Sequence, residues 1–185
     1  MPFARTFTIA ALAATAVPAG ASVIALGNSS AGLCYKAADE RGAPPQVALR
    51  WCDEALAAEN LARADAAATY VNRGILKLRG GDADGAIADF DDALALDRDE
   101  PEAYLNKGMA MLRLPGRTDE AATLFSTAIQ KRTRRPAIAY YGRAVAHESA
   151  GDAKAAYRDY RQASRLAPDW REPKLELARF VVRPR

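Results

Sequence analysis

The chain has little of what catalytic and metal-binding sites require. Its 185 residues include one histidine, His147, and two cysteines, Cys34 and Cys52. The sequence contains no G-x-S-x-G, H-E-x-x-H, Walker or G-x-G-x-x-G motif. These absences argue against an enzyme, so we predict no catalytic residue, no metal ligand and no cofactor.

Aromatic residues are also scarce, at 8% of the chain, whereas alanine is abundant. Alanine is the best helix former, and its small side chain lets helices approach closely. Half of the residues are hydrophobic, which is enough to form a real core. The composition therefore favours closely packed helices over an aromatic β-core, and we predict an all-α fold.

The chain has no large excess of one charge. Its formal net charge of +3 is small, and the charges are spread along the sequence. The densest basic run, residues 131–135, falls where a helix is expected to end, and cations are favourable there because of the helix dipole. We therefore expect a soluble protein without a nucleic-acid partner.

The N-terminus has the organisation of a secretory signal peptide. Arg5 is followed by an apolar, alanine-rich run at residues 9–17, which is too short to cross a bilayer comfortably, and then by an A-x-A pattern ending at Ala21. We predict a signal peptide over residues 1–21 and a flexible segment over residues 22–30. The mature chain is then exported, most simply to the periplasm, without an integral membrane span. An uncleaved N-terminal anchor is the alternative.

The two cysteines predict a disulfide. An even number of cysteines in an exported chain points to such a bond. A redox pair would more often be C-x-x-C, and a metal site would need more ligands than the distant His147. We expect a structural bond between Cys34 and Cys52.

Three segments of the chain repeat one pattern. Each has a tyrosine, a small residue four positions later, a glycine at a turn, and then alanine, an aromatic residue and alanine at i, i+4 and i+7. The second part of the pattern recurs every 35 positions. The small residues are Gly74, Gly108 and Ala144, and the later triplets are Ala86, Phe90 and Ala93; Ala121, Phe125 and Ala128; and Ala156, Tyr160 and Ala163.

Each unit predicts two helices that pack closely. The first helix presents the small residue, and the second presents the alanine–aromatic–alanine stripe on one face. Gly81 can adopt the left-handed backbone at a helix end, as can Gly151. Asp82 and Asp152 can cap the helices that follow, and Pro101 is typical of a helix start.

This pattern resembles the tetratricopeptide repeat (TPR) family, a 34-residue helix–turn–helix repeat. The resemblance covers residues 66–170, divided into units at 66–100, 101–136 and 137–170. It implies an α-solenoid of antiparallel helix pairs that forms a superhelix. Residues 31–65 have the features of a degenerate helix pair joined by the disulfide. Residues 171–185 are expected to form a capping helix and tail, in which Leu175, Leu177, Ala178 and Val181 cover the last repeat.

In the TPR family the first helices line a concave surface that binds ligands. The asparagines of two successive units, Asn72 and Asn106, occupy matching positions, where family members can hold an extended ligand backbone. An amide side chain suits this role because it offers both a donor and an acceptor. The resemblance places these residues in the groove: Asn72, Ile75, Arg79, Leu105, Asn106, Met109, Arg113, Tyr141 and Val145, with Gly142 beside them.

The leading hypothesis is a non-enzymatic periplasmic adaptor that binds a protein or peptide in this groove. The alternative is a structural or assembly module of the cell envelope that uses its convex face or self-association. An enzyme acting on cell-wall glycans is least favoured, because no carboxylate pair can be placed. Arg73, Lys107 and Arg143 either bridge to the acidic second helices or line the groove rim. The acidic cluster around Asp89 is expected to be solvated.

Overall fold

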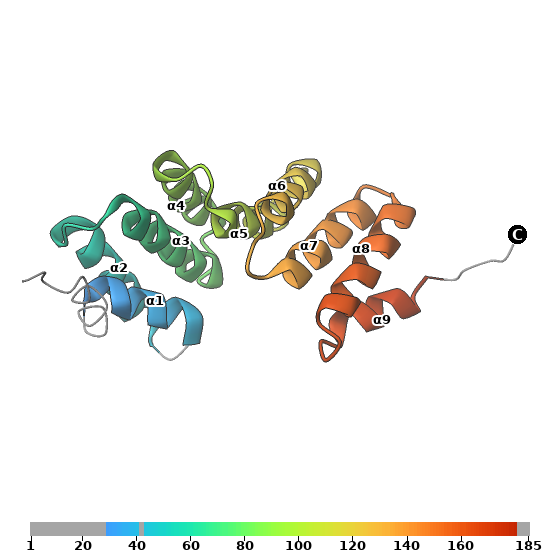
Figure 1. Cartoon of the computed structure of the whole chain (residues 1–185), viewed down its shortest axis with the longest axis horizontal. Helices are drawn as coiled ribbons and strands as arrows, with labels where there is room; N and C mark the ends of the chain where they lie inside the picture. The colour runs from blue at the N-terminus through green and yellow to red at the C-terminus, as the bar shows by residue number, and fades with distance from the viewer. Residues whose placement is uncertain (1–28, 41–42, 181–185) are drawn as a thin grey trace, which may run out of the picture.

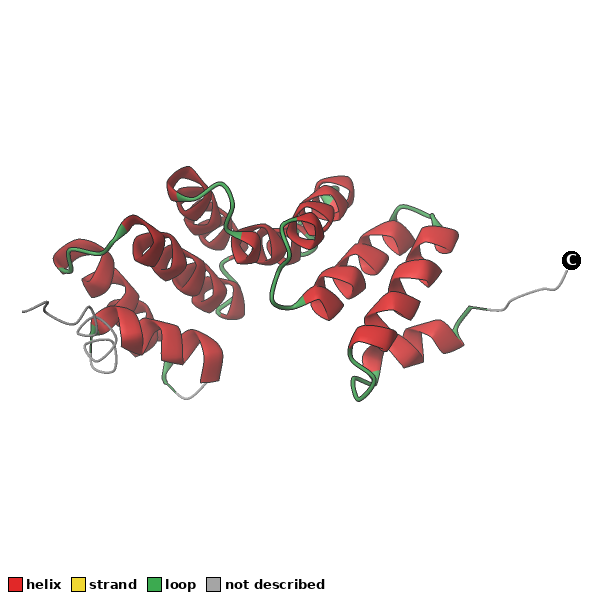
Figure 2. Ribbon diagram, in the orientation of Figure 1, coloured by secondary structure: helices red, strands yellow, loops and turns green. Residues whose placement is uncertain are grey.

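The computed structural model describes residues 29–40 and 43–180, and all its regular elements are helices (Figure 2). This confirms the all-α prediction for the part of the chain described. The predicted signal peptide, the segment up to residue 28 and the tail from residue 181 lie outside these residues.

The helices follow one another in pairs that form an arch (Figure 1). The outer side of the arch carries α4 and α6, and α1 and α9 lie at its two feet. The helix boundaries are α1 (Ser30–Glu40), α2 (Pro45–Ala58), α3 (Arg63–Arg79), α4 (Ala83–Leu96), α5 (Pro101–Met111), α6 (Thr118–Gln130), α7 (Pro136–Ser149), α8 (Ala153–Leu166) and α9 (Glu172–Ala178).

The repeated alanine–aromatic–alanine stripe forms the core, as its spacing predicted. All six alanines of the stripe are 0% exposed, and so are Phe90 and Phe125, while Tyr160 is 1% exposed. Each aromatic ring lies on the second helix of its pair, facing the first helix. Burial of these repeated alanine and aromatic side chains stabilises the packing of the two helices in each pair.

Glycines on the first helices allow the aromatic rings to pack directly against the backbone. A Cβ atom at Gly74 would lie 2.5 Å from Cε1 of Phe90, so only glycine fits against that ring. A Cβ atom at Gly142 would lie 2.4 Å from Cζ of Phe125, which belongs to the preceding unit. Gly142 is therefore a buried packing residue between units, and its expected place in the groove is wrong.

The turns of the first and third units have the predicted chemistry. Gly81 has a φ of 90° and Gly151 a φ of 83°. The carboxylate of Asp82 accepts a hydrogen bond from the Gly85 N–H at 2.8 Å, and Asp152 accepts one from Ala155 at 2.9 Å. The Ala155 bond lowers the pKa of Asp152. This cap therefore stabilises the fold at neutral pH, and its contribution is lost as the pH falls through the lowered pKa.

Removing the aspartate cap of α4 is expected to weaken the fold measurably. Asp82→Ala leaves the Gly85 N–H without its acceptor and should lower the free energy of unfolding by about 1 kcal/mol. Asp82→Asn should retain most of the stability, because asparagine also caps helices. Urea unfolding followed by circular dichroism measures both. Asp92→Ala, at an exposed position of α4, is the control and should change stability by less than about 0.5 kcal/mol.

The two ends of the solenoid are closed differently. At the N-terminal end, a disulfide between Cys34 and Cys52 joins α1 to α2, in agreement with the prediction, and both cysteines are fully buried. At the C-terminal end, Leu177 and Phe180 pack on the cluster around Tyr160. Leu175 was expected to cover the last repeat, but it is 60% exposed, since it lies on the other face of α9 from Leu177. Ala178 was expected there too and is also exposed. The expected contribution of Val181 falls outside the described residues.

Candidate partner-binding groove

A hollow lies among the first helices of the pairs. It has a volume of about 410 Å³ and is bounded by α1, α3, α5 and the loop before α7. A second hollow, of about 590 Å³, shares Tyr35, Ala68 and Asn72 with it and continues along α1. We call the two together the concave groove. The first hollow is lined by Tyr35, Ala68, Val71, Asn72, Ile75, Glu100, Glu102, Asn106, Arg134 and Arg135.

Two of the predicted asparagines line the groove, and each has amide donors or acceptors that do not bond to the described chain. The amide of Asn72 is half-buried and makes no hydrogen bond with any residue that the structure describes. Asn106 donates from Nδ2 to the carbonyl oxygen of Glu102 at 2.8 Å, which leaves its Oδ1 acceptor available. Two amides on adjacent first helices can therefore accept or donate toward a bound chain.

The groove also has an apolar part. Ile75 is half-buried and packs against the neighbouring cores of α1–α2 and α3–α4. Tyr35 of α1 is 57% exposed and lies where the two hollows meet. The sequence analysis missed Tyr35, because it belongs to the degenerate first pair, where the repeat pattern gives no position to align.

Two glutamates of the groove are engaged by the chain itself. Glu102, 8% exposed, accepts hydrogen bonds from Oγ1 of Thr133 and from the backbone N–H of Arg134, both at 2.7 Å. Glu100 precedes α5 and accepts from the Glu102 N–H at 3.0 Å. The Glu102 contacts fix the loop before α7 against α5, and this places Arg134 and Arg135 in the groove.

An ion pair links Arg135, which lines the groove, to Asp39 of α1. Nη2 of Arg135 lies 3.4 Å from Oδ1 of Asp39, at the end of α1, although the two residues are 96 positions apart. Their side chains are 48% and 51% exposed. Arg134 is exposed, and its side chain makes no ion pair with any residue in the described ranges. The sequence analysis attributed these arginines to a helix end, so it missed their place in the groove.

Four residues predicted to line the groove do not line either hollow. Leu105 is 2% exposed and belongs to the core around Phe125, because it faces α6 instead of the hollow. Met109 fills the space between the two neighbouring cores. Tyr141 packs its ring 5.4 Å from Tyr160 and 4.8 Å from Trp170. Val145 joins the cluster beneath α9.

Two predicted arginines hold consecutive first helices together. Arg113 donates from Nη1 to the carbonyl oxygen of Leu78, and Arg79 donates to that of Ala37 at 3.3 Å. These bonds link α5 to α3 and α3 to α1 at the ends of the helices. Neither arginine lines the two hollows that form the groove.

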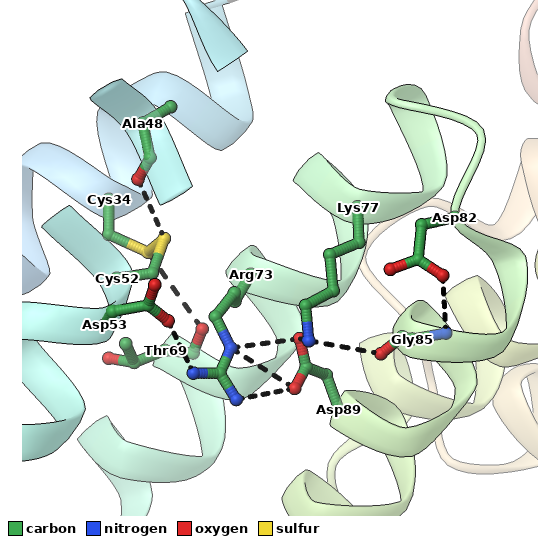
Figure 3. A network of polar contacts seen from close by, with 10 residues as sticks. All are labelled: Cys34, Ala48, Cys52, Asp53, Thr69, Arg73, Lys77, Asp82, Gly85 and Asp89. Carbon is green, nitrogen blue, oxygen red and sulfur yellow. Dashed lines mark hydrogen bonds and ion pairs between the residues drawn. A yellow bond between two sulfur atoms is a disulfide. The ribbon is translucent and has the colours of Figure 1, made fainter. Parts of the chain in front are cut away.

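The basic residues at the next repeat position bridge to the second helices, as one of the two alternatives predicted. Arg73 forms ion pairs with both Asp89 and Asp53 (Figure 3). In the third unit, Arg143 pairs with Asp159 at 2.7 Å. Hydrogen bonding to Asp159 raises the pKa of Arg143. Asp89 is only 2% exposed, so the expectation that it is solvated is wrong. These buried pairs fix the first helices from behind, which preforms the groove.

The repeat model named Tetratricopeptide repeat matches residues 71–131 and 115–169. The matches extend over more than half of the chain, so this protein belongs to the TPR family. No curated protein gives a significant match. The described helices include none with the length and apolar character needed to cross a membrane.

Solved structures share the fold. A MamA structure from Desulfovibrio magneticus RS-1, residues 41 to the end, superposes with a TM-score of 0.64 at 22% identity, covering 83% of this chain and 84% of that one. PilW, described as a type IV pilus biogenesis factor, gives 0.66 at 19% identity, covering 80% and 66%. YrrB, described as a TPR protein with an unusual peptide-binding site, gives 0.60 at 20% identity, covering 83% and 77%.

Proposed function

We propose that this protein is a non-enzymatic adaptor that holds an extended segment of a partner protein in its concave groove. The observation that carries the proposal is the Asn72 amide, half-buried in the groove wall and without a protein partner among the described residues. The amide is reachable from the groove, since among the described residues no buried side-chain nitrogen or oxygen lacks a hydrogen-bond partner. A peptide unit of a ligand can donate to this amide and accept from it in place of water.

The surroundings of Asn72 suit the rest of such a segment. Asn106 offers its free Oδ1 on the next first helix, while Ile75 and Tyr35 provide apolar contacts for alternate side chains. YrrB, which has the same fold, is described as having a peptide-binding site, and this likeness is consistent with the proposal.

We place the adaptor in the periplasm. The signal-peptide pattern that ends at Ala21 supports export, and the buried Cys34–Cys52 disulfide suits an oxidising compartment. Mass measurement of the protein purified from a periplasmic fraction tests both points, since cleavage near Ala21 and loss of two hydrogens on oxidation are both visible.

Removing both groove amides should weaken partner binding while the fold survives. In Asn72→Ala with Asn106→Ala, a bound segment loses two hydrogen-bonding sites worth about 1 kcal/mol each, so its affinity should fall roughly tenfold or more. The measurement is capture from envelope extract, identification of the partner, and titration calorimetry with the segment that it contributes.

The matched control is Asn60→Ala, which removes an exposed asparagine outside the groove. Both proteins should melt within a few degrees of the wild type, because Asn106 makes one local hydrogen bond and Asn72 makes none within the described chain. Affinity that is equal in the double variant and the wild type would rule out the groove as the binding surface.

A further inference from the structure

In the first hollow, the two glutamates already bond to the chain and the arginines are less engaged. Glu102 holds Thr133 and the loop backbone, and Glu100 holds the first turn of α5. The other carboxylates of the groove, Glu40 and Asp65, line the second hollow, away from Arg134 and Arg135. The guanidinium of Arg134 has no carboxylate partner in the described part of the chain. The hydrogen-bonding capacity left for a ligand at this end of the groove is therefore mainly that of a cationic donor.

The second arginine is held only loosely. Arg135 meets Asp39 at 3.4 Å, and both side chains are about half exposed. By comparison, Arg73 meets the buried Asp89 at 2.7 Å. Exposed ion pairs contribute little to stability, so a ligand carboxylate can take the place of Asp39 without disturbing the fold.

We propose that the groove selects an acidic side chain in the bound segment, and that this carboxylate replaces Asp39 on Arg135 while it also contacts Arg134. The inference rests on the proposed function, in which Asn72 and Asn106 hold the segment's backbone. Guanidinium groups suit this role because their planar N–H fork matches a carboxylate with two parallel hydrogen bonds. Asp39 is then an internal competitor that occupies the site until an acidic segment arrives.

The glutamates nearby do not reverse this preference. Glu100 and Glu102 lie at the N-terminal end of α5, where the helix dipole and free backbone N–H groups stabilise negative charge. Oε1 of Glu102 already accepts hydrogen bonds from Thr133 and from the Arg134 N–H, and Oε1 of Glu100 accepts one from the Glu102 N–H, so a ligand lysine would share carboxylates that the chain already uses. A ligand carboxylate meets Arg134 without such competition.

Three pools of short fluorescein-labelled peptides test the proposal. The central residue is fixed as glutamate, glutamine or lysine, and the flanking positions are a shared random mixture of small and apolar residues. Binding to the oxidised protein is measured by fluorescence anisotropy. The glutamate pool should bind roughly fivefold more tightly than the glutamine pool. The lysine pool should bind most weakly, and rising salt should reduce the differences.

Variants locate the selectivity. Arg134→Gln with Arg135→Gln should make the glutamate and glutamine pools bind equally, while the Arg134 backbone N–H still reaches Glu102. Asp39→Asn should strengthen binding of the glutamate pool roughly twofold or more and leave the glutamine pool unchanged. Arg132→Gln is the matched control, because this exposed arginine lies in the same loop and does not line the groove.

The outcomes separate this inference from the proposed function. Equal binding of all three pools to the wild type, or a preference for lysine, overturns the acidic selectivity and leaves peptide binding in place. Failure of every pool to bind contradicts both the selectivity and the peptide-binding groove. The comparison among pools uses the wild-type protein, so it does not depend on any variant folding correctly.

Discussion

Asp89→Ala should lower the free energy of unfolding by about 3 kcal/mol, because it leaves Lys77 without a carboxylate partner and Arg73 with only the exposed Asp53. Asp89 is 2% exposed on α4 and receives two cations from α3, Arg73 at 2.7 Å and Lys77 at 2.8 Å (Figure 3). The side chains of Arg73 and Lys77 are 19% and 24% exposed. Water can therefore recover part of the loss, which places the effect at the low end for buried pairs.

The same helix supplies the control. Asp91 pairs with Lys107 at 2.6 Å, which is as short as the Asp89 contacts, but its side chain is 53% exposed. Asp91→Ala should therefore cost less than about 1 kcal/mol. Guanidinium unfolding of the two variants compares a buried aspartate that pairs with two cations with an exposed aspartate that pairs with one, at similar ion-pair distances. Equal destabilisation would mean that burial does not determine the strength of these pairs.

The buried pairs mark one limit of prediction from this sequence. The alanine and aromatic positions recur with one period and face one side of the second helix, so their burial follows from the spacing. Asp89 carries no such signal, since an aspartate at that position can point to water or to a cation on another helix. Its arginine partner lies 16 positions earlier, as does the arginine partner of Asp159. That shared separation is a signal that the sequence does contain.

The groove marks a second limit. Asn72, Ile75 and Asn106 were predicted from their repeat positions, and they do line one hollow. Leu105 is adjacent to Asn106 in sequence, but one residue turns a helical side chain by about 100°, enough to face it into the core.

Tyr35 and Arg135 were missed for a different reason. Tyr35 reaches the groove because α1 packs on α3, and Arg135 meets Asp39 of α1 across 96 positions of the sequence. Such closure depends on how several pairs stack, and no local pattern in the sequence encodes it.

Removing the disulfide should lower the free energy of unfolding by about 3 kcal/mol, the value that the chain-entropy model gives for a loop of this length. Cys34 and Cys52 are 18 positions apart and both are fully buried. Cys34→Ala with Cys52→Ala keeps the buried site apolar and removes the cross-link together with two buried sulfur atoms, so the reduced wild type serves as the comparison for the cross-link alone. Urea unfolding of the variant and of the oxidised wild type measures the difference. Reductant should destabilise the wild type and leave the variant unchanged.

The loss should be confined to one end of the solenoid. Repeat arrays gain stability from each unit and its immediate neighbours, and among the described helices α1 and α2 pack on one neighbouring helix outside their own pair, α3. Hydrogen exchange should therefore accelerate in α1 and α2 far more than in α7 and α8. Since α1 also carries Tyr35 and Asp39, the variant should bind peptides more weakly although every groove residue is intact. Uniform acceleration across all the helices would instead mean that the array unfolds as one cooperative unit.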